Sequence, residues 1–183
     1  MKYTSWKLPM IILAIIVAVV LVSIFALQGV QNKAISLEEQ ITTAQSEIKI
    51  QEKRRADLIP NLVDCVKEYD KHEHETLMAV VKARGTDSDA AVQEIQTMVV
   101  AVAEAYPQLQ SSENYRELMN ELATTENLIA NVRSNYNKWV TQYNSHIKKF
   151  PNRQVLSMLG YEAGGYEKLN FDVSSDAPTN LFD

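Results

Sequence analysis

The feature that most constrains this chain is an apolar run near its N-terminus, LPMIILAIIVAVVLVSIFAL, residues 8–27. The run contains no charged residue, and at about 1.5 Å per residue a helix of this length spans roughly 30 Å, the thickness of the hydrocarbon core of a bilayer. Pro9 falls in the first turn of such a helix, where a missing N–H costs little. The run therefore predicts one transmembrane helix.

A cleaved signal peptide is the alternative interpretation of this run. The apolar region of a signal peptide usually has about 7–15 residues and ends at a small-residue cleavage site. Here the run is longer, FALQGVQN at its end matches such a site poorly, and no Cys lies nearby. We therefore predict an uncleaved anchor, with a short tail at residues 1–7 and a transmembrane helix at residues 8–30.

The charges that flank the run predict its orientation. Lys2, Lys7 and the α-amino group precede it, and Lys33, followed by Glu38 and Glu39, comes after it. Lys and Arg are retained on the cytoplasmic side of a membrane. We expect the N-terminus in the cytoplasm and the following domain outside it, on a difference of about two charges.

Composition indicates the fold class of the chain after the apolar run. Gly and Pro number five each and hydrophobic residues make up 46 %, a profile that favours a helical domain. The formal charge is −5 and there is no basic cluster along the sequence, so nucleic acid is not an expected partner. The single cysteine, Cys65, can form no internal disulfide.

Helical periodicity continues directly after the apolar run. No Gly or Pro lies between residues 31 and 55, and apolar residues recur there at spacings of 3 and 4: Ala34, Leu37, Ile41, Ala44 and Ile48. This is one seam of an amphipathic helix that continues the anchor. At RRADLIPNLV, residues 54–63, we predict a helix restart with Asp57 as cap and Pro60 in the first turn. The alternative is a kink inside one continuous helix.

Three further helices are predicted along the chain. One runs from the restart to Arg84, before the loop GTDSD, and a shorter one ends at Tyr106-Pro107. A long fourth helix starts at a cap, Ser112 or Asn114, and ends near Phe150-Pro151. Its apolar stripe is the strongest periodic signal after the anchor: Leu118, Leu122, Thr125, Ile129, Val132, Tyr136, Val140, Tyr143 and Ile147.

These patterns predict an all-α fold. We expect the transmembrane helix to continue into an antiparallel bundle of about four long helices over residues 31–160. Residues 161–183 have no helical period and many turn-forming and acidic residues, so they are predicted to be an extended or disordered acidic tail.

Polar residues at helical spacing accompany the apolar stripe. The pair Tyr-Asn occurs twice, seven residues apart, which places both pairs on one face of the helix. The polar residues that share one flank of that face are Glu126, Arg133, Asn137 and Asn144. Their candidate partners lie at the predicted restart: Arg54, Arg55, Asp57 and Asn61.

Such a polar line persists only if its members satisfy one another, since an unpaired buried Arg costs several kcal/mol. We interpret the line as a structural network that fixes the register between antiparallel helices, as buried Asn does in coiled coils. The aromatic residues of the same region, Tyr136, Tyr143 and Phe150, are expected to help hold the bundle together. The alternative is a ligand site for a carboxylate or phosphate on Arg133.

Other chemistry-bearing residues give weaker patterns. HEHE at residues 72–75 holds four potential metal ligands, but neighbours one and two apart on a helix point in different directions, so a solvated face is the preferred interpretation. Glu68 and His72 could bind zinc only with further ligands, and His146 is far along the chain. Cys65 is most simply a small core residue. With no GxSxG, phosphate-binding glycine loop or CxxC pair, neither catalysis, nor a cofactor, nor a metal is predicted.

Two blocks of the sequence together resemble the LemA family. RRADLIPNLVDCVKEYDKHEHETLMAVVKAR is similar to the family's RRxDLIPNLV segment and its following HExxxLxxVxxAR helix. The stretch from YPQL to KKFP is similar to the second block: YPxL, then ENxI, RxxYN, YNxxI and FP. The resemblance covers roughly residues 8–161 and implies a bacterial membrane protein with one N-terminal transmembrane helix, an antiparallel helical bundle and no established enzymatic activity.

This chain departs from the family pattern at two places. Gln31-Asn32 stands where the family often has Tyr-Asn, and an acidic, Ser-rich tail replaces the usual aromatic-rich ending. The expected function is a non-catalytic, membrane-anchored scaffold or assembly protein that forms homo-oligomers. Two alternatives remain: a membrane-tethered sensor or small-ligand receptor that uses Glu126, Arg133 and Asn137, and an accessory subunit of a membrane-bound hydrolase, whose partner would be another membrane protein.

Overall fold

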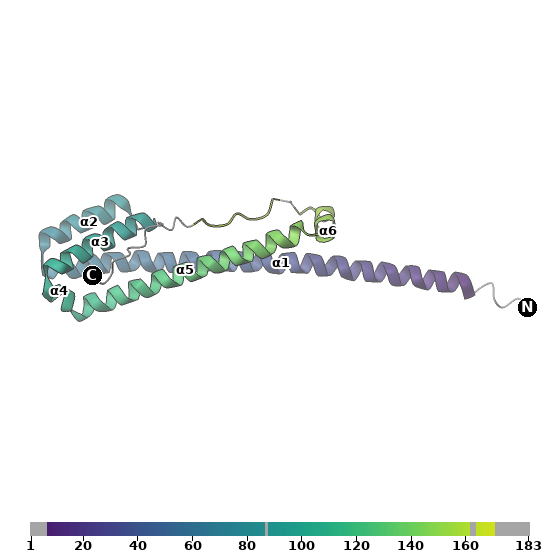
Figure 1. Cartoon of the computed structure of the whole chain (residues 1–183), viewed down its shortest axis with the longest axis horizontal. Coiled ribbons are helices and arrows are strands. Elements are labelled where there is room, and N and C mark those ends of the chain that lie inside the picture. Colours follow the sequence, from purple (N-terminus) through teal and green to yellow (C-terminus); the bar gives the residue numbers. More distant parts are fainter. Residues whose placement is uncertain (1–6, 87, 162–163, 171–183) are drawn as a thin grey trace, which may run out of the picture. The chain divides into compact units, whose positions relative to one another are not determined.

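Helices account for all the regular structure in the part of the chain that is described. The computed structural model describes residues 7–86, 88–161 and 164–170 (Figure 1). The helices in these ranges are α1 Lys7–Asp64, the 3₁₀ turn η1 Cys65–Glu68, α2 Lys71–Arg84, α3 Asp89–Ala105, α4 Pro107–Ser111, α5 Glu113–Lys148 and α6 Asn152–Met158. No strand occurs in these ranges, so the predicted all-α class is confirmed.

α1 contains the apolar run. It is one helix of 58 residues, and it is the one helix in the described chain that is long and apolar enough to cross a membrane. None of its most apolar stretch is buried inside the protein. Beyond the run, all five residues of the predicted seam are buried: Ala34, Leu37, Ile41, Ala44 and Ile48.

The predicted restart at Asp57 is wrong, because α1 continues through Pro60 to Asp64. A proline inside a helix costs about 3 kcal/mol through its lost hydrogen bond and ring clash. Four apolar neighbours on both sides of it are buried: Leu58, Ile59, Leu62 and Val63. Each such burial contributes about 1.5–3 kcal/mol, which exceeds the cost of the proline. Asp57 instead pairs with Lys53 on the exposed surface, at 3.3 Å.

The chain breaks ten residues later than the proline, at Asp70. Its carboxylate accepts hydrogen bonds from the backbone N–H groups of His72 and Glu73, which is how an N-cap residue satisfies the first turn of a helix. Tyr106 donates a further hydrogen bond to the same carboxylate at 2.6 Å. These hydrogen bonds, the Tyr106 one foremost, hold the pKa of Asp70 below its usual range. Asp70 is therefore the cap that sequence reasoning assigned to Asp57.

The predicted ends of the later helices agree more closely. α2 ends at Arg84, before Gly85, whose φ of 72° is accessible to glycine. α3 ends one residue before Tyr106, and Pro107 opens the additional short helix α4. α5 begins at Glu113, and Ser112, one of the two predicted caps, accepts from the N–H of Tyr115 at 3.4 Å.

The chain divides into two compact units, one of Met1–Thr42 with Tyr136–Asp183 and one of Thr43–Asn135. α1 and α5 each contribute to both units. In the first unit the two helices run antiparallel, since Val30 lies against His146 and Glu38 against Tyr143.

The second unit has its own antiparallel α1–α5 pair and its own core. Glu52 lies against Arg133 and Arg54 against Glu121, so the numbering again rises on one helix as it falls on the other. The core side chains come from α1, η1, α2, α3, α4 and α5: Leu58, Ile59, Leu62, Val63, Val66, Leu77, Val92, Ile95, Val99, Ala103, Leu109, Tyr115 and Leu122.

Candidate functional site

The first polar site is a cluster of charges in the second unit, centred on Arg133 of α5. Its Nη1 donates to Oδ2 of Asp89 at 2.6 Å, and its Nη2 donates to Oε1 of Glu52 at 2.6 Å and to Oδ1 of Asp89 at 3.2 Å. The Arg133 side chain is 16 % exposed, whereas the side chains of Glu52 and Asp89 are 33 % and 58 % exposed, so these charge-assisted hydrogen bonds join a mostly buried guanidinium group to carboxylates that reach solvent. Asp89 and then Glu52 raise the pKa of Arg133.

Arg55 of α1 enters the same cluster from a deeper position. Its side chain is 1 % exposed, and Nη1 donates to Oδ1 of Asp89 at 2.7 Å and lies 3.5 Å from the carboxylate of Glu126. Asp89 therefore bridges two guanidinium groups. The hydrogen bond from Arg133 and then the one from Arg55 hold the pKa of Asp89 below its usual range, against the opposing effect of its burial.

Sequence reasoning brought Arg55, Arg133 and Glu126 into one network, and the structure places all three in this cluster. It missed Asp89 and Glu52. Asp89 was assigned to a loop, but it is the first residue of α3, directly after the cap Ser88, where acidic residues are favoured. That position was the available signal.

The remaining residues predicted at the restart lie outside the cluster. Arg54 pairs with Glu121 at 2.7 Å, in a half-exposed position on the surface. Asp57 pairs with Lys53, and Asn61 lines a separate cavity. The described contacts of Arg54, Asp57 and Asn61 therefore lie outside the Arg133 cluster.

The second polar site is formed by the two Tyr-Asn pairs of α5, which bind the backbone of a later segment of the chain. Asn144 donates from Nδ2 to the carbonyl of Tyr166 at 2.8 Å, and its Oδ1 accepts from the N–H of the same residue at 3.0 Å. Asn137 repeats this arrangement on Leu169, at 2.9 Å and 2.8 Å. Between them, the hydroxyl of Tyr136 donates to the carbonyl of Glu167 at 3.1 Å. We call this arrangement the backbone clasp.

The spacing of the clasp follows from the geometry of its two partners. Seven residues on an α-helix advance by about 10.5 Å, and three residues of extended chain advance by about 10 Å. Asn137 and Asn144 are seven apart, and Leu169 and Tyr166 are three apart. Each asparagine can therefore meet one residue of the same extended segment, which runs antiparallel to α5. Residues 164–170, predicted from the sequence to be extended or disordered, are extended and held on α5. Residues 171–183 of the predicted tail lie outside the described range.

Aromatic and glycine contacts complete the clasp. The rings of Tyr143 and Tyr166 meet edge to face with centroids 5.1 Å apart, and the Tyr143 hydroxyl donates to Glu38 of α1 at 2.7 Å. Burial and then the Glu38 contact raise the pKa of Tyr143. Gly165 has a φ of 71°, and a Cβ added there would overlap Oδ1 of Asn144, so this position requires glycine.

Two predicted groupings need correction. Asn137 and Asn144 were expected to share a network with Arg133, but their amide groups are used by the backbone of the segment. Phe150 was expected to hold the bundle together, but its side chain is 83 % exposed, because α5 ends at Lys148 before the apolar stripe can include it.

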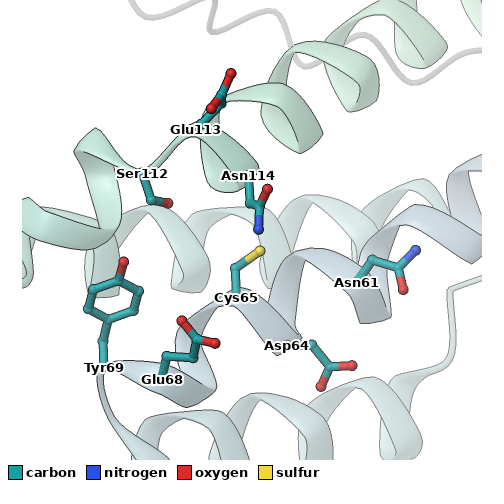
Figure 2. A pocket seen from close by; sticks show the side chains of 8 residues that line it. All are labelled: Asn61, Asp64, Cys65, Glu68, Tyr69, Ser112, Glu113 and Asn114. Atoms are coloured by element: carbon teal, nitrogen blue, oxygen red, sulfur yellow. The ribbon is translucent and has the colours of Figure 1, made fainter.

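An open cavity of about 380 Å³ surrounds Cys65 in the second unit (Figure 2). Figure 2 shows the carboxylates of Asp64, Glu68 and Glu113 among the side chains that line it. Burial, followed by the charges of Asp64 and Glu68, raises the pKa of the Cys65 thiol. A thiol in an acidic environment remains protonated, which is the opposite of what a nucleophilic cysteine requires.

The histidines occupy separate structural positions. His74 lies 2.9 Å from Asp64, and His146 lies 2.9 Å from the carbonyl of Val30. Within the described ranges, no group of three or more His, Cys, Asp or Glu side chains is arranged to hold a metal ion. His72 and Glu68 do not form part of such a group.

Comparison with known proteins identifies the family. The sequence model of the LemA family matches residues 44–180. This chain belongs to the LemA family. The matched range contains most of the LemA-like bundle, including the Arg133 cluster and the backbone clasp, and it begins after the apolar run.

Relatives of this LemA-family chain fall into two groups. Protein LemA of Metamycoplasma hominis is 26 % identical over 168 residues, which cover 82 % of this chain and 77 % of that protein. Magnetosome proteins MamQ 2 and MamQ 1 of Paramagnetospirillum magneticum are each 34 % identical over 68 residues, covering 37 % of this chain and 25 % of theirs. The similarity to the first therefore extends over most of the LemA chain, and the similarity to the other two over a segment.

Proposed function

We propose that this LemA-family protein is a non-catalytic scaffold that is anchored in a bacterial membrane by α1. One observation carries the proposal: Arg133, Asn137 and Asn144, the motif side chains best suited to bind a ligand, form hydrogen bonds with other parts of the same chain. Arg133 contacts Asp89 and Glu52, and Asn137 and Asn144 contact the segment at residues 166–169. Such groups hold segments together.

The same observation weighs against the receptor alternative. A carboxylate or phosphate ligand would have to displace Asp89 and Glu52 from the terminal nitrogens of Arg133, since both nitrogens already donate to carboxylates. Asn137, the third residue of the proposed receptor line, is engaged with Leu169. A new anion would exchange one set of charge-assisted hydrogen bonds for another, with little net gain.

Self-association is the expected activity of this scaffold. Ile35 and Ile50 of α1 are both exposed although both lie beyond the apolar run, and lateral association with a second copy of the chain would cover them. Light scattering and electron microscopy of the detergent-extracted chain should give a protein mass that is a multiple of the 20.7 kDa monomer. Ile50→Gln should reduce that mass and the matched Lys49→Gln should leave it unchanged. A wild-type particle of one chain would overturn the proposal.

Absence of catalysis has its own test. Replacing Cys65 by Ala and His72, His74 and His146 by Gln removes the nucleophilic and metal-binding side chains together. If the protein is a scaffold, this variant should complement a deletion strain as well as the wild type does. Loss of complementation by a folded, membrane-inserted variant would indicate a role for a metal or a nucleophile.

The membrane orientation follows from the lysines at the N-terminus. We propose that the N-terminus is cytoplasmic and the helical units are extracytoplasmic. In a Cys65→Ala background, Asn180→Cys should react with a membrane-impermeant thiol reagent added to intact spheroplasts. Labelling only after lysis would reverse the orientation.

A further inference from the structure

The corner between α5 and α6 lies next to the end of the apolar run. His146, near the end of α5, contacts the carbonyl of Val30 at 2.9 Å. Because a carbonyl only accepts, the His146 Nε2 donates, and its Nδ1 is 3.1 Å from Asn152 of α6. Val30 comes three residues after Leu27, the last residue of the run, which is about 4.5 Å along the helix. Figure 1 shows α6 just beyond the C-terminal end of α5.

This corner exposes apolar side chains that none of the described residues of the first unit covers. Phe150 is 83 % exposed and Met158 is 86 % exposed. Single exposed apolar residues are ordinary on a protein surface. Here Phe150 and Met158 occur in one short hairpin together with Leu159, which is 46 % exposed, while Leu156 of the same hairpin is buried. Their position beside the membrane span distinguishes them from scattered surface residues.

The corner is also the basic part of an acidic chain. Residues 145–160 contain Lys148, Lys149 and Arg153 and no Asp or Glu, and residues 28–37 of α1 contain Lys33 and no Asp or Glu. The whole chain has 18 Lys and Arg against 23 Asp and Glu. Lys148, Lys149 and Arg153 are exposed and appear in no ion pair among the described residues.

We propose that this corner is a lipid-binding foot that lies in the headgroup layer of the membrane. The inference rests on the proposed role of α1 as the anchor. The headgroup region adds about 5–7 Å to each side of the hydrocarbon core, and the contact at Val30 places the corner within that layer. Phe150 and Met158 contact lipid, and Lys148, Lys149 and Arg153 contact anionic headgroups, as amphipathic surface segments do.

The foot gives the first unit a second attachment beside α1. A single transmembrane helix fixes the height of a domain but leaves it free to rotate and tilt. A second contact at the headgroup layer removes part of that freedom, so neighbouring copies present the same face to each other. Continuity of the foot with the membrane span identifies lipid, and not a soluble protein, as its partner.

Spin labels on the full chain in vesicles test the foot. In a Cys65→Ala background, labels at Phe150→Cys and Met158→Cys are compared with labels at Val22→Cys in the apolar run and Thr141→Cys on exposed α5. The vesicles contain either about one third anionic lipid or none. We expect the label at position 150 to be accessible to oxygen, as at position 22, and protected from a water-soluble nickel reagent, unlike the label at position 141.

Charge removal sharpens the test. Each Lys or Arg near an anionic surface contributes about a fivefold preference, so Lys148→Ser, Lys149→Ser and Arg153→Ser together should release the label at position 150 to water. A label at position 150 as exposed to nickel as that at position 141 would overturn the foot. A label in lipid that responds neither to vesicle charge nor to the triple variant would overturn the assignment of the basic side chains. Water exposure at position 22 would instead contradict the anchor itself.

Discussion

The two units use polar side chains in opposite ways. In the second unit, Arg133 and Arg55 bind the carboxylates of Asp89, Glu52 and Glu126, so each contact depends on the identity and charge of both side chains. In the first unit, the side-chain amides of two asparagines bind backbone N–H and carbonyl groups. Every residue except proline offers those groups, so the clasp is indifferent to the side chains it holds.

The two sites show that α5 takes part in two kinds of specific contact. The charge cluster selects which helices meet, because a wrong neighbour would leave an Arg without a partner. The backbone clasp selects a conformation, because only an extended segment presents residues at the spacing of two helical turns. The first should respond strongly to side-chain replacement at its partners, and the second chiefly to changes that alter backbone position.

The largest effect should come from Arg133→Leu. It removes three charge-assisted hydrogen bonds from a mostly buried guanidinium group to the partly exposed carboxylates of Asp89 and Glu52, and we expect a loss of about 3 kcal/mol. Circular dichroism of thermal unfolding of the full chain in detergent should show a melting temperature lower by roughly 6–10 °C. The matched variant Arg54→Leu breaks a half-exposed pair and should cost less than about 1 kcal/mol. Equal melting temperatures for Arg133→Leu and wild type would reopen the ligand interpretation.

Gly165→Val should have an intermediate effect that is confined to the first unit. Its Cβ would overlap Asn144, and its positive φ would be strained, so the segment should detach from α5 at a cost of about 1–3 kcal/mol. Gly164→Val is the matched control, because a Cβ at that position meets nothing within 4 Å. Limited proteolysis should cut the first variant after Tyr161 and spare the second. Equal cleavage of both would contradict the clasp.

Acid should produce the smallest effect, and only in the second unit. Arg133 lowers the pKa of Asp89 in the folded state below the ordinary value of 3.8. The contribution of ionised Asp89 to the free energy of unfolding is therefore complete above pH 3.8 and is lost as the pH falls through the lowered pKa of the folded state. The difference in melting temperature between wild type and Asp89→Asn should be constant from pH 7 to about pH 5 and should shrink below about pH 4. A difference that already shrinks between pH 7 and pH 5 would contradict the assigned direction.

Much of the fold could be predicted because its signals are local. Helical spacing alone gave the buried seam of α1 and most of the stripe of α5, of which Leu122, Ile129 and Val140 are among the buried members. The continuous helix through Pro60, the alternative to a restart, could not be preferred from the sequence alone, because its stability depends on burial against other elements. The local cost of a proline is visible in the sequence, and the compensating contacts are not.

The two polar sites also combine residues that local sequence patterns predicted with partners that they did not predict. Helical spacing placed Arg133 and Glu126 on one face, but the central partner, Asp89, comes from α3, far away along the chain. The equal spacing of the Tyr-Asn pairs indicated a shared binding role. The occupant could not be deduced, because backbone groups leave no signature in a sequence and the segment at residues 166–169 has no helical or strand pattern.

Hydrogen exchange at the amides of Tyr166 and Leu169 tests the central claim most directly, that the polar motif residues hold the chain's own segments. These amides donate to Asn144 and Asn137, respectively. In the full chain both should exchange slowly, and Asn144→Leu should speed exchange at Tyr166 at least about tenfold, because two hydrogen bonds are lost. Asn135→Leu, at an exposed position on the same helix, should leave the rate unchanged. Fast exchange at both amides in the wild type, or an unchanged rate in Asn144→Leu, would contradict the account.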